Sequence, residues 1–435
     1  MGGPAANGHA RAGSRRTTEL LRFATAGSVD DGKSTLIGRL LYDAKSILAD
    51  QLAAVKTASK RRNGNGAIDL ALLTDGLRAE REQGITIDVA YRYFQTTRRK
   101  FIIADTPGHE QYTRNMVTGA STADLAVVLI DARHGVVAQS RRHAVIASLL
   151  GIPHLVVCVN KMDLVGFDEA AYDAVVEDFT DFAARLDVHD VTSIPVCALH
   201  GDNVVNRSAA MPWYEGPSLL HHLEHVHIAS DRNLSDVRFP VQWVVRSGAG
   251  STGSEYRGYA GQMAGGVLEP GAEVVVLPSQ RRTRVAAIET VDGPLERAFP
   301  PMSVTLRLED DVDVSRGDLI CGAVDPPTSV RELEATVCWM ADAPLVPGGR
   351  YALKHTTRSA RAVVSAIQDR LDVETLARDR SAGELRLNDI GRVALRTSEP
   401  LVADTYTGNR TTGAFILIDE TTNETVGAGM IAGAS

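Results

Sequence analysis

The stretch Gly27-Ser28-Val29-Asp30-Asp31-Gly32-Lys33-Ser34-Thr35 decides the fold of this chain. It matches the phosphate-binding loop pattern of glycine, four residues, then Gly-Lys-Ser. An apolar stretch at 23–26 precedes it, and apolar residues at helical spacing follow it: Leu36, Ile37, Leu40 and Leu41. We therefore predict a strand, the loop and a helix in that order, in which backbone N–H groups and the helix N-terminus converge on an anion. A chance turn of glycine and lysine is the alternative.

The residue types in this loop suggest their roles. The Lys33 ammonium would pair with the β- and γ-phosphates of a nucleoside triphosphate, and the Ser34 hydroxyl would bind Mg²⁺. We therefore predict that residues 27–35 form part of a nucleotide site, with Lys33 also assisting catalysis.

Composition sets the class of protein. A length of 435 residues predicts about three domains. The contents of hydrophobic (44%) and charged (23%) residues are usual for a soluble globular protein, and the net charge of −8 argues against a broad electrostatic grip on nucleic acid. No apolar run approaches the ~18 residues of a membrane span. We expect a cytoplasmic protein that binds neither nucleic acid nor membranes.

The cysteines support a reducing compartment. They form no CxxC pair and no ligand-like cluster with histidine, so we predict buried free thiols at Cys158, Cys197, Cys321 and Cys338.

Residues 1–20 are rich in glycine, alanine and arginine and are expected to form a disordered arm.

Over residues 21–236, short apolar strands alternate with helices. The strand candidates lie at 101–104, 126–130, 155–159 and 194–198, and one helix covers 172–186. This alternation predicts an α/β domain with a mostly parallel sheet covered on both faces, which binds ligands at the carboxyl ends of its strands.

From Val237 onward the pattern changes to many short strands separated by glycine-rich turns. The strand candidates lie at 273–278, 285–288, 304–308, 335–340, 362–367, 385–387, 392–396 and 415–418. Such spacing predicts β-barrels or sandwiches. Pro326-Pro327 marks the expected boundary between two β domains, residues 237–327 and 328–435.

Two stretches would complete the phosphate side of the site. Asp105-Thr106-Pro107-Gly108-His109 follows a predicted strand, so Asp105 is placed to hold the Mg²⁺ shell through water and the Gly108 N–H to reach a γ-phosphate. In the sequence Gly-Ile-Thr-Ile at 84–87, Thr86 would supply a second hydroxyl to Mg²⁺ only when a γ-phosphate is present. A plain turn and a threonine that begins a strand are the respective alternatives.

Two further stretches would read the base. Asn160-Lys161-Met162-Asp163 follows an apolar strand, and the Asp163 carboxylate can accept hydrogen bonds from both N1–H and N2–H of guanine, which adenine lacks. Asn160 would support the loop and read the other edge of the base, with the Lys161 stem over the ring. The backbone of Cys197-Ala198-Leu199 could contact the guanine oxygen. Taken alone, the first tetrapeptide could be a solvated polar turn.

In this order, the motifs resemble those of translational-type GTPases such as elongation factor Tu. Within that group the chain is most similar to the family of large, GTP-hydrolysing subunits of heterodimeric ATP sulfurylases (sulfate adenylyltransferases), over about residues 20–433. The markers are the phosphate loop and the stretches 80–91, 105–116 and 415–419. Ser28 stands where elongation factors carry histidine, and Cys197 where serine is usual.

The resemblance implies a P-loop GTPase domain followed by two β-barrels, with GTP and Mg²⁺ as ligands. It also implies that GTP hydrolysis drives the formation of adenylyl sulfate and pyrophosphate from ATP and sulfate on a separate small catalytic subunit, within a heterodimer or a higher assembly. His109 would position the attacking water, and Thr86 and residues 105–116 would respond to the γ-phosphate.

Two rival functions remain open at this stage: an elongation factor that delivers aminoacyl-tRNA, and a regulatory switch with no coupled reaction. Some relatives carry a fused kinase for adenylyl sulfate. Because the sequence to Ser435 holds no second phosphate loop, we do not expect that activity.

Overall fold

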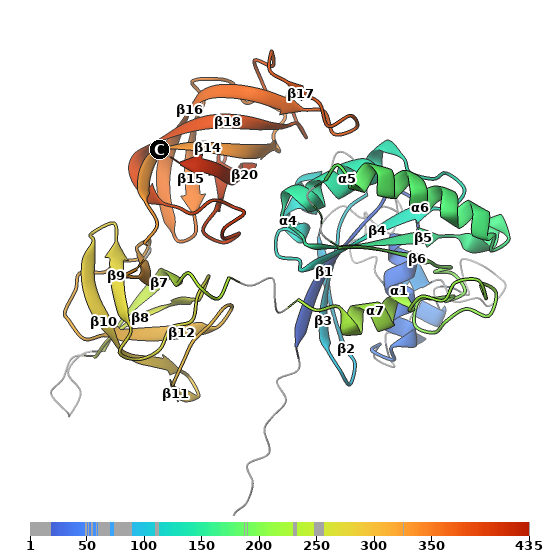
Figure 1. The fold of residues 1–435 in the computed structure, drawn as a ribbon, viewed down its shortest axis with the longest axis horizontal. Helices are drawn as coiled ribbons and strands as arrows, with labels where there is room; N and C mark the ends of the chain where they lie inside the picture. Colours follow the sequence, from blue (N-terminus) through green and yellow to red (C-terminus); the bar gives the residue numbers. More distant parts are fainter. Residues whose placement is uncertain are drawn as a thin grey trace, which may run out of the picture.

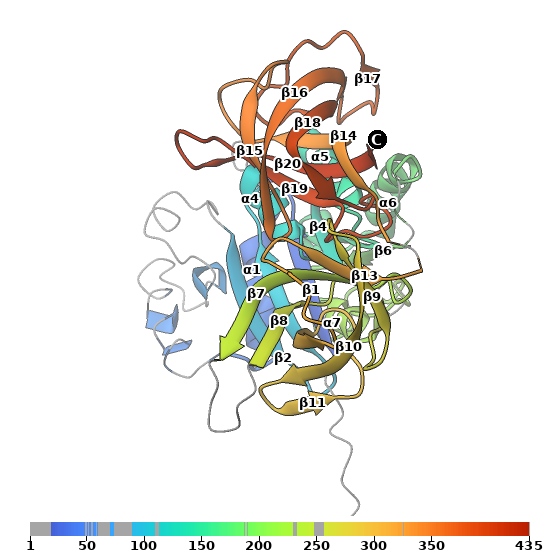
Figure 2. The same ribbon diagram turned by 90° about the vertical axis from the view of Figure 1, so that its left-hand side faces the viewer.

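The computed structural model describes residues 19–47, 70–73, 89–108, 113–186, 190–228, 233–247, 256–324 and 326–434, and positions 50, 52–53, 55–57, 59 and 188. All but the last two residues of the predicted N-terminal arm lie outside these ranges, as do Thr86 and His109. An α/β domain comes first in the chain and two β domains follow, lying one above the other beside it (Figure 1 and Figure 2). Among the described residues, no helix has the length and apolar character needed to cross a membrane.

The first sheet positions the nucleotide loops. Its six strands run in the order β2-β3-β1-β4-β5-β6. β2 pairs antiparallel with β3 and all other neighbours pair in parallel, so the predicted mostly parallel sheet is confirmed. The strands are β1 (Leu20–Ala26), β2 (Ala90–Gln95), β3 (Lys100–Asp105), β4 (Leu125–Asp131), β5 (His154–Asn160) and β6 (Asp190–Pro195).

Helices cover both faces of this sheet because each buries one apolar stripe against it. α4, α5 and α6 pack on one face through residues such as Val117, Ile146 and Phe179. α1 and α7 pack on the other through residues such as Leu36 and Leu223. The helices are α1 (Lys33–Asp43), α4 (Thr113–Ala120), α5 (Ala138–Leu149), α6 (Glu169–Ala183) and α7 (Leu219–His225), with short 3-10 turns η1 (Leu70–Leu73) and η3 (Met162–Val165).

Two predicted strands were wrong in detail. The strand expected at 194–198 is β6 at Asp190–Pro195, and residues 196–198 lie in the loop beyond it. Four residues of β6 are only half buried, since it is an edge strand, and their mixed polarity concealed them. The strand expected at 385–387 is absent: Leu385 forms a single bridge with Leu345 and is apolar because it is fully buried in the last domain.

Both β domains are closed barrels, as predicted. The second sheet has the order β11-β10-β12-β8-β7-β13-β9 and closes through β10–β9, and the third has the order β15-β19-β20-β14-β18-β16-β17 and closes through β15–β16. Each encloses its own apolar core. The second sheet contains β7 (Arg238–Ser247), β8 (Tyr256–Gln262), β9 (Glu273–Leu277), β10 (Arg281–Thr290), β11 (Gly293–Leu295), β12 (Ser303–Leu308) and β13 (Leu319–Gly322). The third contains β14 (Ser329–Trp339), β15 (Arg350–His355), β16 (Arg358–Leu371), β17 (Arg378–Asp379), β18 (Ile390–Val402), β19 (Ala414–Ile418) and β20 (Thr425–Ala434).

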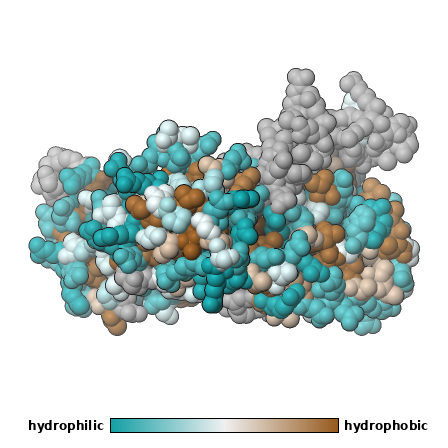
Figure 3. Space-filling view, turned by 90° about the horizontal axis from the view of Figure 1, so that it is seen from above, coloured by the Kyte–Doolittle hydropathy of each residue, from teal (hydrophilic) through white to brown (hydrophobic). Residues whose placement is uncertain are grey.

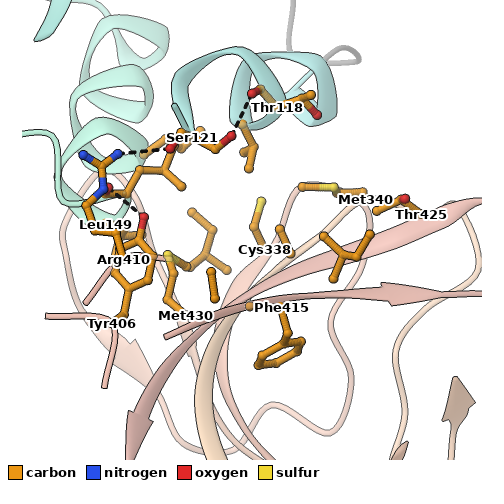
Figure 4. Close-up of a pocket in the computed structure, with 18 of the residues that line it drawn as sticks. Thr118, Ser121, Leu149, Cys338, Met340, Tyr406, Arg410, Phe415, Thr425 and Met430 are labelled. Carbon is orange, nitrogen blue, oxygen red and sulfur yellow. Dashed lines mark hydrogen bonds between the residues drawn. The ribbon is translucent and has the colours of Figure 1, made fainter. Parts of the chain in front are cut away.

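The loop between β18 and β19, residues 403–413, joins the last barrel to the α/β domain; we call it the joint loop. The Tyr406 hydroxyl donates to the Leu150 carbonyl at 2.8 Å. The Arg410 guanidinium donates to the carbonyls of Ser121 at 3.1 Å and Ala123 at 3.3 Å. Figure 4 shows both side chains reaching from the barrel toward the helices, beside a cavity of about 380 Å³ between the domains.

The joint loop also contacts the first barrel. The Asp404 carboxylate accepts two hydrogen bonds from the Arg238 guanidinium, both at 2.9 Å, and the Asn409 side chain donates to the Ala264 carbonyl at 3.0 Å. One loop therefore contacts both other domains.

The four cysteines are free and buried, as predicted.

On the face seen from above, hydrophobic residues are interspersed with hydrophilic ones (Figure 3).

Candidate functional site

The phosphate loop joins the end of β1 at Ala26 to the start of α1 at Lys33. Its turn needs glycine at Gly32, which has a φ of +93° and whose missing Cβ would lie 2.6 Å from the Asn160 amide nitrogen. Inside the loop, the Ser28 N–H donates to the Asp31 carboxylate at 2.5 Å. The loop therefore has the strand–loop–helix setting that phosphate binding requires.

Lys33 points back over this loop. The residue is 7% exposed, and its ammonium donates to the carbonyls of Gly27 at 2.8 Å and Ser28 at 2.9 Å. Burial lowers the pKa of Lys33, while the nearby Asp105 carboxylate acts in the opposite direction. A Cβ on Gly108 would lie 2.3 Å from the Lys33 nitrogen, so only glycine allows these two loops to meet.

Oxygen ligands suited to Mg²⁺ lie beside this lysine. Asp105 ends β3 with 1% exposure and accepts a hydrogen bond from the Thr25 hydroxyl at 3.4 Å. The Thr106 hydroxyl donates to the Thr25 carbonyl at 2.6 Å, which ties the Asp-Thr-Pro-Gly turn to β1. Ser34 lies in the first turn of α1. A hydroxyl and a carboxylate next to bound phosphates are the ligands Mg²⁺ prefers, so these residues fit the ion.

Asn160 links the phosphate side of the site to the base side. It ends β5 with 2% exposure. Its amide nitrogen donates to the Asp31 carbonyl at 2.7 Å, and its amide oxygen accepts from the Ala198 N–H at 3.0 Å. The supporting role expected of this residue therefore has a specific geometry, in which one side chain bridges two loops.

Lys161 is held by a carboxylate that sequence reasoning missed. Its backbone is left-handed, with a φ of +63°, and its ammonium lies 2.9 Å from the Asp131 carboxylate. Arg133 donates to both oxygens of that carboxylate, at 3.1 and 2.7 Å. Burial raises the pKa of Asp131, but the hydrogen bonds from Arg133 and Lys161 outweigh burial and hold it well below its usual range. The sequence signal that could have indicated Asp131 is its position directly after the apolar run 125–130.

Asp163 and Cys197 meet at the base side. The Cys197 thiol donates to the Asp163 carboxylate, with sulfur and oxygen 3.1 Å apart. Burial, followed by this hydrogen bond, raises the pKa of Cys197 to about 12, so the side chain is a neutral thiol. Met162 is fully buried between Lys161 and Asp163.

The base-side loop is also fastened to α1. The Arg39 guanidinium donates to the Ala198 carbonyl at 3.2 Å and to the Leu199 carbonyl. The backbone of residues 197–199 was expected to contact the guanine oxygen, and within it the Ala198 N–H donates to Asn160. Sequence reasoning had assigned no role to Arg39.

The structure thus brings together the predicted residues of the phosphate loop, the Asp-Thr-Pro-Gly turn and both base-side stretches at the carboxyl edge of the sheet. Thr86 and His109 lie outside the described residues, so their assignments remain predictions.

Replacing Asn160 by alanine is expected to weaken GTP and GDP binding together. The substitution removes the partners of the buried Asp31 carbonyl and Ala198 N–H, and each unsatisfied group costs about 1–3 kcal/mol. Urea unfolding should show a comparable loss of stability, and titration with a fluorescent GDP should show the loss of affinity. The exposed Asn206 gives a matched control, Asn206→Ala. Unchanged stability and affinity in Asn160→Ala would show that the two hydrogen bonds of the Asn160 side chain contribute neither to folding nor to nucleotide binding.

Known proteins share these features. Residues 18–234 match the family described as elongation factor Tu GTP binding domain, and residues 332–432 match the GTP-eEF1A C-terminal domain-like family. The chain is 63% identical over 415 residues to the bifunctional enzyme CysN/CysC of Mycobacterium tuberculosis, which covers 95% of this chain and 67% of that relative. It is 51% identical over 414 residues to sulfate adenylyltransferase subunit 1 of Alteromonas mediterranea, which covers 95% of this chain and 87% of that relative.

The chain thus spans about two thirds of the bifunctional relatives, of which that from Rhodopirellula baltica is covered to 63%. Among solved structures, sup35 complexed with GDP aligns over 99% of this chain and 97% of its own, at 23% identity and a TM-score of 0.44.

Proposed function

The chain belongs to the sulfate adenylyltransferase subunit 1 family of GTPases, and from that premise we propose that GTP hydrolysis on this chain drives the synthesis of adenylyl sulfate and pyrophosphate from ATP and sulfate. In this proposal the adenylyl transfer takes place on a separate, small catalytic subunit. The observation that carries it is a guanine-type nucleotide site in a chain 51% identical to a relative of that name over 87% of the relative's length.

The proposed coupling has a thermodynamic reason. Adenylyl sulfate contains a phosphate–sulfate anhydride, so its formation from ATP and sulfate is very unfavourable. A second hydrolysis can supply the missing free energy only if a protein element differs between its states with and without the γ-phosphate.

The residues of this chain would divide the work as follows. Lys33 would hold the β- and γ-phosphates, with the Gly108 N–H against the γ-phosphate, and His109 would position the attacking water. Ser34 and Asp105, together with Thr86, would hold Mg²⁺, which neutralises charge on the phosphates when it is bound. Asp163 would read guanine and so set the preference for GTP.

α4 offers a route from the γ-phosphate to the barrels. This helix begins at Thr113, five residues after Gly108 in the chain. Just beyond its C-terminal end, the carbonyls of Ser121 and Ala123 accept hydrogen bonds from Arg410 in the joint loop. A displacement of α4 on loss of the γ-phosphate would therefore reach the last barrel directly, and through the joint loop the first one.

The test is phosphate release measured beside adenylyl sulfate formation. The isolated chain should form no adenylyl sulfate and hydrolyse GTP slowly, since a water-positioning histidine acts well only when its loop is held in place. Adding the small sulfurylase subunit with ATP and sulfate should accelerate hydrolysis. His109→Ala should remove that acceleration while GTP still binds, whereas replacement of the exposed His227 by alanine should not.

Equal rates of phosphate release with and without the small subunit would overturn the coupling, even if GTP binds. Copurification of RNA in place of a small subunit would favour the elongation-factor alternative.

A further inference from the structure

At the base-side loop, Asp163 lies close to two side chains, Cys197 and His200, to which no step above assigns a role. Single ligand atoms of Asp163, Cys197 and His200 all lie within 4.8 Å of one another. Within the described part of the chain, no other group of three or more histidine, cysteine and acidic side chains meets this criterion. Cys197 has 0% exposure, while His200 is exposed. A small ion would thus enter between a buried sulfur and a solvent-facing imidazole.

The turn after β6 creates this arrangement. The Gly201 N–H donates to the Cys197 carbonyl at 2.7 Å, and the Cys197 N–H donates to the Asp202 carbonyl at 3.1 Å. Gly201 has a φ of +93°, which lets the chain reverse sharply. The turn therefore returns His200 toward Cys197, three residues earlier in the chain.

Thiolate, imidazole and carboxylate are the three ligand types that Zn²⁺ takes in proteins, at about 2.0–2.3 Å. Three atoms within 4.8 Å of one another can reach one such ion with small adjustments. A tetrahedral ion would keep its fourth position for water.

We propose that Asp163, Cys197 and His200 bind a thiophilic divalent cation such as Zn²⁺, and that this ion and the guanine base exclude each other because both require the Asp163 carboxylate. The exclusion rests on the proposed function in one respect, the assignment of Asp163 to the base. The cation site itself rests on the three side chains alone.

Binding involves no redox change. The Cys197 thiol gives its proton to solvent, its sulfur forms a bond to the ion, and the hydrogen bond to Asp163 is replaced by coordination. Because the Cys197 thiol donates its proton to Asp163, the ion must displace that proton, and each binding event releases about one proton. The cost of deprotonation favours metals with high thiolate affinity over Mg²⁺.

The first experiment adds Co²⁺ to the full-length protein without nucleotide and records the thiolate-to-cobalt charge-transfer absorption. The wild type should show the band, and Zn²⁺ should remove it. Cys197→Ser should abolish the band, and His200→Ala should weaken Co²⁺ binding at least tenfold. His227→Ala, which removes another exposed imidazole of the same domain, should bind as the wild type does. A wild type without the band, or a band that survives in Cys197→Ser, would overturn the proposal.

The second experiment titrates fluorescent GDP at rising Zn²⁺. For competition at one site, the apparent dissociation constant rises linearly with free Zn²⁺, reaching about tenfold at nine times the Zn²⁺ dissociation constant. The slope should fall at least tenfold in His200→Ala, which retains GDP affinity in the absence of Zn²⁺. A cobalt band that GDP leaves intact would refute the exclusion. The coupling assay with the small subunit fails or succeeds independently of the band, so failure of this proposal and failure of the proposed function are distinguishable.

Discussion

Lys33→Ala is expected to lower the affinity for GTP and GDP by about a hundredfold or more and to remove detectable hydrolysis. Lys33 is 7% exposed, and the Gly27 and Ser28 carbonyls hold its ammonium in the space that Gly108 leaves open. Hydrogen bonds from a charged group contribute about 1.5–3 kcal/mol each, and one ammonium can serve more than one phosphate oxygen. Alanine removes all of them at once.

Isothermal titration with GTP and GDP at fixed Mg²⁺ measures this loss. Lys100→Ala is the matched control, because Lys100 is exposed at the opposite end of β3 from Asp105. Burial lowers the pKa of Lys33, so its charge is a cost to the nucleotide-free fold. A variant that binds GTP within threefold of the wild type would contradict the phosphate assignment.

Asp163→Asn should transfer the nucleotide preference from GTP to XTP. The amide would place N–H donors opposite the guanine donors, and an unpaired donor costs about 1–3 kcal/mol, so the two guanine positions together predict a loss of GTP affinity of about a hundredfold. Xanthine carries a carbonyl where guanine has its amino group, so the new amide can donate to it. The thiol of Cys197, now 3.1 Å from the Asp163 carboxylate, can still donate to the amide oxygen.

Competition of GTP, XTP and ATP against fluorescent GDP tests this switch. Asp168→Asn is the matched control, since Asp168 caps α6 by accepting from the Ala171 N–H and asparagine can do the same. Wild-type protein that binds ATP as tightly as GTP, or a variant that gains nothing on XTP, would exclude Asp163 as the base reader.

The fold was predictable where burial and local pattern agree. β4 and β5 are buried on nearly every residue, so their apolar runs identified them directly. β6 was misplaced because its first residues lie half exposed at the sheet edge, and apolar content then no longer marks a strand. At Leu385 the error was the opposite one: an apolar residue was taken for part of a strand although it lies in a loop. The barrel core contains apolar side chains from loops as well as from strands.

The candidate site was predictable as a set of residue types but not as a network of contacts. The spacing of the motifs indicated Lys33, Asp105 and Asp163, because each follows a strand that ends at one edge of the sheet. The ion pair between Asp131 and Lys161 and the hydrogen bond from Arg39 to the base-side loop form only in the folded chain. Each joins residues that lie far apart in the sequence. Spacing along the sequence carries no such information.

The joint loop has a consequence for how this protein can diverge. The hydrogen bonds of Tyr406 and Arg410 across the domain boundary end on backbone carbonyls, at residues 121, 123 and 150. Every amino acid has a backbone carbonyl oxygen, so a substitution at any of these three positions keeps the hydrogen-bond acceptor. These hydrogen bonds therefore place no requirement on the side chains at the three acceptor positions, whereas they require the tyrosine and the arginine on the other side of the boundary. A chimera that pairs this α/β domain with barrels from a distant relative needs those two side chains to inherit the same hydrogen bonds.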